Sequence, residues 1–184
     1  PAFTHSKILS KQLLAALPFK MTAAQKRVSK EISDDLKQHK PMLRLVQGDV
    51  GAGKTLVAAL AACHALEEGW QVALMAPTEI LAEQHYLNFK RWFEPLGLTV
   101  AWLSGKQKGK ARALAEQQIQ QGSAQLVIGT HALFQDSVAF HKLGLVIIDE
   151  QHRFGVDQRL ALRNKGAQQT TPHQLVMTAT PIPR

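Results

Sequence analysis

The segment 48–55, GDVGAGKT, constrains the fold of this 184-residue chain more than any other part of its sequence. It matches the pattern G-x-x-x-x-G-K-[ST] at every position, and this pattern is meaningful only where a strand ends and a helix begins. A strand-length apolar run, 43–46, precedes it, and a helix-like stretch, 54–68, follows it. We therefore expect the chain to be built on a strand, loop and helix unit, which is the repeating unit of α/β proteins.

Apolar runs and amphipathic stretches alternate along the rest of the chain. The further runs of strand length are 72–76, 98–103, 126–128, 145–148 and 175–177. Several of them are apolar throughout, which is typical of strands buried on both faces of a parallel sheet. The further helix-like stretches are 79–93, 110–121, about 6–17 and about 22–38. The sequence therefore predicts an α/β fold, a mostly parallel sheet with helices on both faces.

The length of the chain is enough for one well-packed domain and too small for two of ordinary size. We expect residues 1–40 to form a helical lead-in and residues 41–184 to form the α/β domain itself. The chain starts at Pro1 rather than at a methionine, and it stops at Arg184 shortly after an expected strand. We therefore expect it to be a fragment of a larger protein.

The glycine-rich segment predicts a nucleotide site with its magnesium ion. Gly48, Gly51 and Gly53 let the backbone turn its N–H groups toward phosphate oxygens, and the helix N-terminus adds a favourable dipole. Lys54 is then expected to hold the β- and γ-phosphates, and the Thr55 hydroxyl is expected to bind Mg²⁺. The alternative is a glycine-rich turn that only caps a helix. Pattern and context agree, which argues against that alternative.

Two carboxylates, Asp149 and Glu150, end the apolar run 145–148. In open α/β sheets the ligand lies at the carboxyl ends of the strands, the same edge that carries the phosphate loop. Asp149 is therefore expected to hold Mg²⁺, through water, and Glu150 to orient or deprotonate the water that attacks the γ-phosphate. A strand that simply ends in acidic residues facing solvent is the competing interpretation.

Gln25 has two readings from its spacing alone. Its amide can pair with N6 and N7 of adenine, with Phe19 stacking nearby, and would then select ATP over GTP. Thr22 and Gln25 also have the spacing of a capping box, in which Gln25 returns to the backbone N–H of the cap. The residues do not decide between the two.

Three segments are candidates for a nucleic-acid face. Pro77 and Thr78 follow one expected strand and begin a helix, and Thr130 and His131 follow another. If the sheet is parallel, both pairs lie on one edge, where helix-start N–H groups can face a phosphate backbone. Helix capping is the commoner use of such threonines.

The third segment, 104–112, is the densest basic stretch of the chain and contains no acidic residue. Its cations suit phosphate contacts, although solvated loops are often rich in lysine as well. The net charge of +8 and a pI near 9.8 also favour a polyanionic partner. The candidate contacts here are Ser104, Gly105, Lys106, Lys108 and Lys110.

The single cysteine, Cys63, has no partner for a disulfide or a zinc site and is expected to be a small core residue. The apolar run 56–62 around it is too short to cross a bilayer, and the N-terminus has no signal-peptide pattern. We expect no membrane partner and a reducing, cytoplasmic setting.

Taken in order, these motifs resemble those of superfamily 2 helicases. The resemblance is carried by residues 19–25, 48–55, 77–79, 129–130, 149–152 and 178–180. The segments 47–51, 75–85, 148–156 and 177–184 are similar to the RecG family of bacterial branch-migration helicases. Transcription-repair coupling translocases share the closing TATPIPR but usually have DEEH where residues 149–152 read DEQH, which favours RecG.

This resemblance implies the first RecA-like motor domain of an ATP-dependent, double-stranded-DNA translocase that remodels forks and junctions. It implies that Gln25 reads adenine, and that Gln151 and His152 link the γ-phosphate to Thr178 and Thr180. The segment from Arg153 and Phe154 through Arg159 would then form a loop that passes the nucleotide state to DNA. A non-hydrolysing, ATP-gated binding module is an alternative of a different class, and Glu150 beside Asp149 argues against it.

The resemblance also implies partners in the same full-length protein. These are a wedge domain that grips branched DNA and a second RecA-like domain that donates an arginine finger. Such an arginine contributes roughly 10³–10⁵-fold to the rate of hydrolysis. We therefore expect this fragment alone to bind nucleotide far better than it hydrolyses it, and to recognise junctions weakly.

Overall fold

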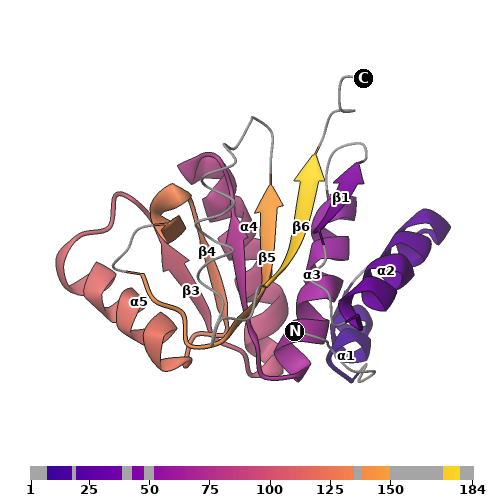
Figure 1. The fold of residues 1–184 in the computed structure, drawn as a ribbon, viewed down its shortest axis with the longest axis horizontal. Coiled ribbons are helices and arrows are strands. Elements are labelled where there is room, and N and C mark those ends of the chain that lie inside the picture. Colours follow the sequence, from indigo (N-terminus) through magenta and orange to yellow (C-terminus); the bar gives the residue numbers. More distant parts are fainter. Residues whose placement is uncertain are drawn as a thin grey trace.

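The computed structural model describes residues 8–17, 20–38, 43–47, 52–134, 138–149 and 172–178 (Figure 1). Its helices are α1 (Ile8–Ala16), α2 (Ala23–Leu36), α3 (Ala52–Glu67), α4 (Glu79–Phe93) and α5 (Gly109–Gln121), with short 3₁₀ helices η1 (Glu94–Leu96) and η2 (His131–Phe134). Its strands are β1 (Leu43–Gln47), β2 (Gln71–Met75), β3 (Val100–Leu103), β4 (Leu126–Gly129), β5 (Leu143–Asp149) and β6 (His173–Thr178). Every strand and helix expected from the sequence is present among them.

The strands form one sheet in the order β1-β6-β5-β2-β4-β3, and every neighbouring pair is parallel. Figure 1 shows β1, β5 and β6 running side by side with their arrowheads at the same edge. The predicted parallel sheet is therefore confirmed. The strand expected at 98–103 begins only at Val100, because η1 continues α4 and Gly97 then turns the chain with a φ of +87°. Glycine adopts that left-handed conformation without steric cost.

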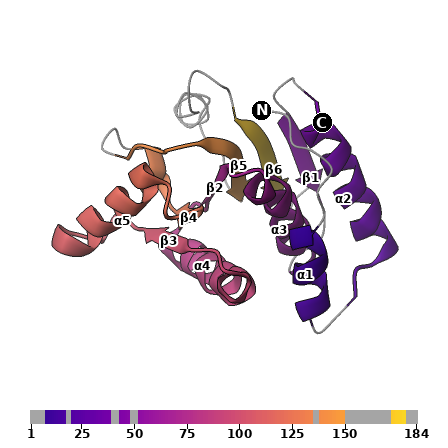
Figure 2. The same ribbon diagram turned by 90° about the horizontal axis from the view of Figure 1, so that it is seen from below.

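The sheet is buried on both faces, as its apolar strands predict. Along β5, Leu145 and Ile147 face the core on one side, and Val146 and Ile148 face the core on the other. Helices α3 and α4 cover the first face, with α1 and α2 packed on α3 beyond it, and α5 and η2 cover the second (Figure 2). Helices on both faces were expected from the pattern of elements, and the structure confirms this arrangement.

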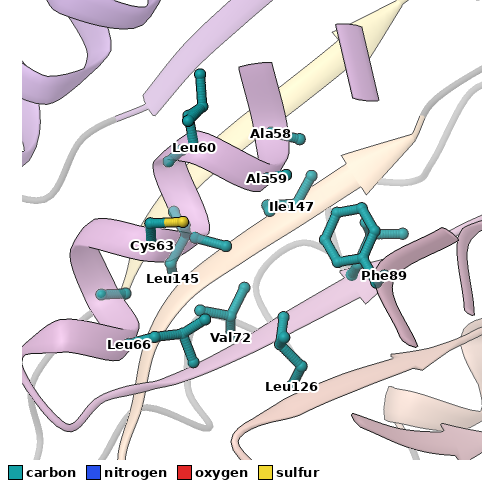
Figure 3. Packing of buried hydrophobic residues seen from close by; sticks show 14 of the residues in the cluster. Ala58, Ala59, Leu60, Cys63, Leu66, Val72, Phe89, Leu126, Leu145 and Ile147 are labelled. Atoms are coloured by element: carbon teal, nitrogen blue, oxygen red, sulfur yellow. The ribbon is translucent and has the colours of Figure 1, made fainter. Parts of the chain in front are cut away.

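Helix α3 lies against the sheet through small residues. Figure 3 shows Ala58, Ala59 and Cys63 of this helix next to Leu145 and Ile147 of β5. Alanine and cysteine side chains allow the helix axis to approach the strands closely. Cys63 is buried and free, as predicted. Burial raises the pKa of its thiol, and the nearby Glu67 carboxylate adds to the rise.

The lead-in helices are tied to the same core. Leu13 of α1 and Leu36 of α2 are fully buried against α3. Near the end of α3, the Glu67 carboxylate accepts a hydrogen bond from the backbone N–H of Leu9, in the first turn of α1. A carboxylate at a helix N-terminus also interacts favourably with the helix dipole. No helix in the described ranges is long and apolar enough to cross a membrane.

The strand register brings the carboxyl ends of all six strands to one edge. Gln47 of β1 lies beside Thr178 of β6, and Asp149 of β5 lies beside Met177. Farther along the edge, Met75 of β2 is level with both Ile148 and Gly129. The residues that follow these strand ends are those predicted to bind phosphates, magnesium and nucleic acid. The parallel sheet therefore satisfies the condition on which the single-edge prediction rested.

Candidate nucleotide and nucleic-acid site

The segment predicted to bind phosphate lies between β1 and α3, as its pattern requires. Lys54 and Thr55 lie in the first turn of α3 and are half-buried, and Gly53 is part of the same turn. Gly48 and Gly51 lie outside the described residues. Helix α3 begins at the carboxyl edge of the sheet, so its N-terminal N–H groups face the region where strands end. A phosphate placed there meets the positive end of the helix dipole.

Asp149 is the last residue of β5 and is nearly buried. Its Oδ2 lies 2.6 Å from Nε2 of His85, which comes from the buried face of α4. An ionised carboxylate only accepts hydrogen bonds, so the imidazole is the donor in this contact. His85 was not among the site residues predicted from the sequence.

The donors at this edge fit a magnesium ion. Mg²⁺ prefers oxygen ligands and is usually held by one or two carboxylates together with water and substrate phosphates. Asp149 offers a carboxylate of which Oδ2 contacts His85, and no hydrogen bond joins its Oδ1 to another described residue. Thr55 offers a hydroxyl from α3, which packs against β5. The described ranges hold no cluster of three or more acidic, histidine or cysteine side chains, so a dedicated all-protein cage is absent from them.

Gln25 forms the capping box that its spacing allows. The Thr22 hydroxyl accepts a hydrogen bond of 3.1 Å from the N–H of Gln25, and the Gln25 Oε1 accepts one of 2.8 Å from the N–H of Thr22. The capping interpretation is confirmed. The amide Nε2 makes no hydrogen bond to the described residues, so it keeps a donor for a ligand. Adenine recognition remains a prediction, and Phe19 lies outside the described residues.

Thr78 and Thr130 occupy the strand ends expected of them, in different ways. Thr78 caps α4, and its hydroxyl accepts a hydrogen bond of 3.2 Å from the N–H of Leu81. Pro77 next to it is half-buried. The side chain of Thr130 is only 1 % exposed, and its hydroxyl has no partner within the described ranges, whereas His131 is exposed. A ligand at this edge reaches His131 directly but meets Thr130 only after a local rearrangement.

Ser104 is part of a polar network rather than a free surface group. Its side chain is 3 % exposed, and its hydroxyl donates a hydrogen bond of 2.6 Å to Oε2 of Glu79, the first residue of α4. The other oxygen of Glu79 accepts a 3.2 Å hydrogen bond from the N–H of Gly105. Glu79 therefore joins the start of α4 to the loop that follows β3.

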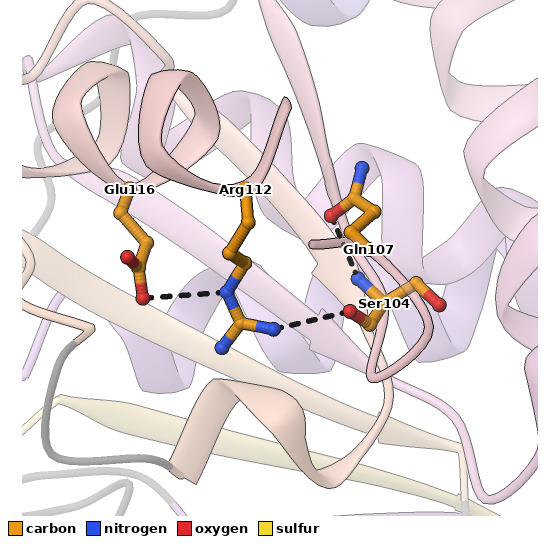
Figure 4. A network of polar contacts seen from close by, with 4 residues as sticks. All are labelled: Ser104, Gln107, Arg112 and Glu116. Atoms are coloured by element: carbon orange, nitrogen blue, oxygen red, sulfur yellow. Dashed lines mark hydrogen bonds and ion pairs between the residues drawn. The ribbon is translucent and has the colours of Figure 1, made fainter. Parts of the chain in front are cut away.

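The same loop is braced from α5 (Figure 4). Nη1 of Arg112 donates a hydrogen bond of 3.1 Å to the carbonyl of Ser104, and its Nε donates one of 3.3 Å to Glu116 one turn later. Gln107 closes the turn by accepting a 3.1 Å hydrogen bond from the N–H of Ser104. Around this fixed backbone, Lys106, Lys108 and Lys110 are all exposed. Residues 104–110, here called the Ser104 loop, thus present three exposed lysines, the last of them in the first turn of α5.

The remaining candidates fall mostly outside the described residues. Thr178 is the last residue of β6, beside Gln47 at the end of β1. The others outside the described ranges are Glu150, Gln151, His152, Arg153, Phe154, Arg159 and Thr180. Their predicted roles stay predictions.

The comparisons with known proteins agree with these observations. Residues 22–184 match the family model "DEAD/DEAH box helicase". The chain is 66 % identical over 177 residues to the ATP-dependent DNA helicase RecG of Escherichia coli O157:H7, an alignment that covers 96 % of this chain and 26 % of that protein. The similarity to RecG expected from the motifs is therefore confirmed. The chain spans about a quarter of the length of the curated relatives it matches.

Two solved structures show the same architecture. A structure of RecG bound to a three-way DNA junction superposes with a TM-score of 0.86 at 46 % identity, over 100 % of this chain and 24 % of the other. The Hef helicase domain of Pyrococcus furiosus superposes with a TM-score of 0.67 at 24 % identity, over 88 % of this chain and 34 % of the other. The second likeness concerns the fold alone. The fold is therefore the RecA-like α/β fold that the sequence predicted.

Proposed function

This chain belongs to the DEAD/DEAH box helicase family, and we propose that it is the first RecA-like motor domain of an ATP-dependent DNA helicase of the RecG type. The observation that carries this proposal is the convergence of its site at one sheet edge. Lys54 and Thr55 begin α3, Asp149 ends β5, and the Ser104 loop follows β3, all at the carboxyl ends of parallel strands. A nucleotide and a nucleic-acid backbone that both bind along this edge would contact the same set of strands and helices.

ATP and Mg²⁺ are the cofactors that this arrangement suits. Lys54 holds the β- and γ-phosphates, the α3 N-terminus adds its dipole, and Thr55 and Asp149 hold the metal. Bound Mg²⁺ neutralises charge that builds up on the phosphates. Glu150, which follows Asp149 in the sequence, positions the attacking water. Gln25 reads adenine with its free Nε2 while its Oε1 caps α2.

Branched DNA is the proposed substrate. The support is the 66 % identity to RecG and the likeness to a RecG structure bound to a three-way junction. The exposed lysines of the Ser104 loop and the helix starts after β2 and β4 supply phosphate contacts without reading bases. The relatives that the chain matches are about four times as long. A wedge domain and a second RecA-like domain of the same protein are proposed to complete the helicase. Helices α1 and α2, within the proposed lead-in of residues 1–40, pack on α3.

The proposal makes a binding prediction that the chain itself tests. Calorimetric titration is expected to show saturable binding of Mg·ADP and Mg·ATP, weak competition by GTP, and loss of binding in Lys54→Ala. The lysine supplies the positive charge opposite the phosphates, so its removal is expected to weaken binding at least ~10-fold without unfolding the domain.

Hydrolysis belongs to the full-length protein. There, ATP turnover is expected to rise on addition of a three-way DNA junction and to disappear in Lys54→Ala. Glu150→Gln is expected to keep nucleotide binding and lose turnover, since it keeps the shape of the side chain and removes the base. Full-length protein that is folded, binds no nucleotide and hydrolyses none with any DNA would refute the proposal.

A further inference from the structure

His85 makes a buried contact with Asp149, the carboxylate assigned above to the magnesium site. Its Nε2 is 2.6 Å from Oδ2 of Asp149, and the two side chains are 9 % and 12 % exposed. One oxygen of the carboxylate is therefore occupied by a donor from the protein. The rotation of the carboxylate about its last bond is fixed by that donor, and Oδ1 is the oxygen left for another ligand.

The orientation of the His85 imidazole also depends on this contact. Its second nitrogen, Nδ1, is buried and has no hydrogen-bond partner among the described residues. Most buried polar atoms form a hydrogen bond, and breaking one is costly. The contact with Asp149, together with packing, therefore orients the His85 ring. Neighbouring residues on the same buried face of α4, Ala82 and Phe89, pack into the core. The position of the ring is thus set by the helix.

Helix α4 is itself held at its start. Thr78 caps it, and the Glu79 carboxylate binds both the hydroxyl of Ser104 and the N–H of Gly105. His85 lies seven residues after the cap, about 10 Å along the helix axis. A donor on a helix that is fixed at both its start and its buried face can impose one geometry on its partner.

Resting on the function proposed above, we propose that His85 is a positioning residue, which holds Asp149 by its Nε2–H in the orientation that presents Oδ1 to magnesium. It touches neither the nucleotide nor the metal. Hydrogen-bonded partners of metal-binding carboxylates orient them in this way, and their loss typically lowers metal affinity or activity by about 10- to 100-fold.

The competing explanation is that His85 only fills space in the core. Three variants separate the two. His85→Leu keeps the volume and removes the donor, and His85→Gln places an amide N–H near the position of Nε2. Phe89→Leu is the matched control, because it lies one turn later on the same buried face of α4 and takes no part in the contact with Asp149.

The experiment is calorimetric titration of ADP into the full-length protein at a series of Mg²⁺ concentrations, with the melting temperature measured beside it. His85→Leu is expected to raise the Mg²⁺ concentration that gives half the magnesium-dependent gain in ADP affinity by ~10-fold. His85→Gln is expected to restore most of this shift. Phe89→Leu is expected to lower the melting temperature and leave the Mg²⁺ midpoint unchanged.

Two results would overturn the inference. One is a folded His85→Leu protein with the wild-type Mg²⁺ midpoint. The other is a shift of equal size in Phe89→Leu, which would mean that packing alone sets the midpoint. Wild-type protein that binds no ADP at any Mg²⁺ concentration is a different failure, since it would refute the proposed function rather than the role of His85.

Discussion

Gly129 occupies a position where the backbone leaves no room for a side chain. It ends β4, and a Cβ built on it would lie 2.2 Å from the backbone carbonyl oxygen of Leu103 on the paired strand β3. A backbone atom in a sheet cannot move aside as the end of a flexible side chain can. The close approach of β3 and β4 at this edge therefore requires glycine, independently of any function of the neighbouring Thr130.

Gly129→Ala is accordingly expected to lower the free energy of unfolding by roughly 1–3 kcal/mol, the usual cost of overpacking a close-packed site. Gly105→Ala is the control, because the nearest atom to its added Cβ is Oε1 of Glu79 at 3.7 Å, an ordinary contact distance. Its expected cost is within about 0.5 kcal/mol. Urea denaturation of the two variants and wild type gives both values. Equal stability of Gly129→Ala and wild type would mean that β3 moves freely against β4.

Two of these contacts differ in whether the sequence could predict them. The capping box at Thr22 and Gln25 was predictable because it is local, with both hydrogen bonds spanning three residues. The contact between His85 and Asp149 spans 64 residues and was not predicted. The only signal for it was a histidine on the buried face of an amphipathic helix, and that pattern indicates burial without naming a partner.

At the scale of elements, Gln71 joins three of them at the amino edge of the sheet. Its side chain is buried at the start of β2, where Nε2 donates hydrogen bonds of 2.9 Å to the carbonyls of Ile119 in α5 and Ala124 before β4. Its Oε1 accepts a 2.8 Å hydrogen bond from the N–H of Lys142 before β5. The Gln71 amide thus forms hydrogen bonds with three backbone groups that the hydrogen bonds between strands leave out.

Gln71→Met keeps the length of the side chain and removes all three hydrogen bonds. The carbonyl of Ala124 and the N–H of Lys142 lose their partner, while the carbonyl of Ile119 keeps the N–H of Gly122, and the loss is expected to cost about 2–4 kcal/mol of unfolding free energy. Gln125→Met serves as a graded control, because within the described residues that side chain accepts a single 2.8 Å hydrogen bond, from the N–H of Thr99 at a more exposed site. Its expected cost is below about 1.5 kcal/mol. Chemical denaturation that ranks the two variants equally would contradict this account.

The elements themselves were largely predictable, and for a physical reason. A run that is apolar throughout is stable in few conformations other than a strand buried on both faces. All six strands lie within two or three residues of their expected bounds. The expected start of β3 was displaced toward the C-terminus by η1, a 3₁₀ turn that apolar periodicity does not mark. The strand order was not predicted. It depends on which strands pair across the sheet, and that information is not local.

At the scale of the whole molecule, positive charge occurs at both ends of the sheet. The Ser104 loop carries exposed lysines beside β3, at one end, and α1 and α2 carry others beyond β1, at the opposite end (Figure 1). The net charge of +8 does not show which of these two groups of lysines contacts DNA. The first group lies at the carboxyl edge, in the loop whose Ser104 and Gly105 hydrogen-bond Glu79 at the start of α4. The proposed function therefore assigns the DNA contacts to the loop and predicts that the lysines of α1 and α2 contribute little.

A pair of triple variants tests that assignment in the full-length protein. One replaces Lys106, Lys108 and Lys110 with alanine, and the other replaces Lys11, Lys26 and Lys30, so both remove three exposed positive charges. Each lysine that contacts a phosphate adds about 0.9 to the slope of log affinity against log salt. Anisotropy titrations with a three-way junction between about 50 and 200 mM salt are expected to show the slope reduced by roughly 2–3 in the loop variant and nearly unchanged in the helix variant. Equal reductions in both would show that net charge rather than the loop attracts the DNA, because only a local contact distinguishes variants of the same charge.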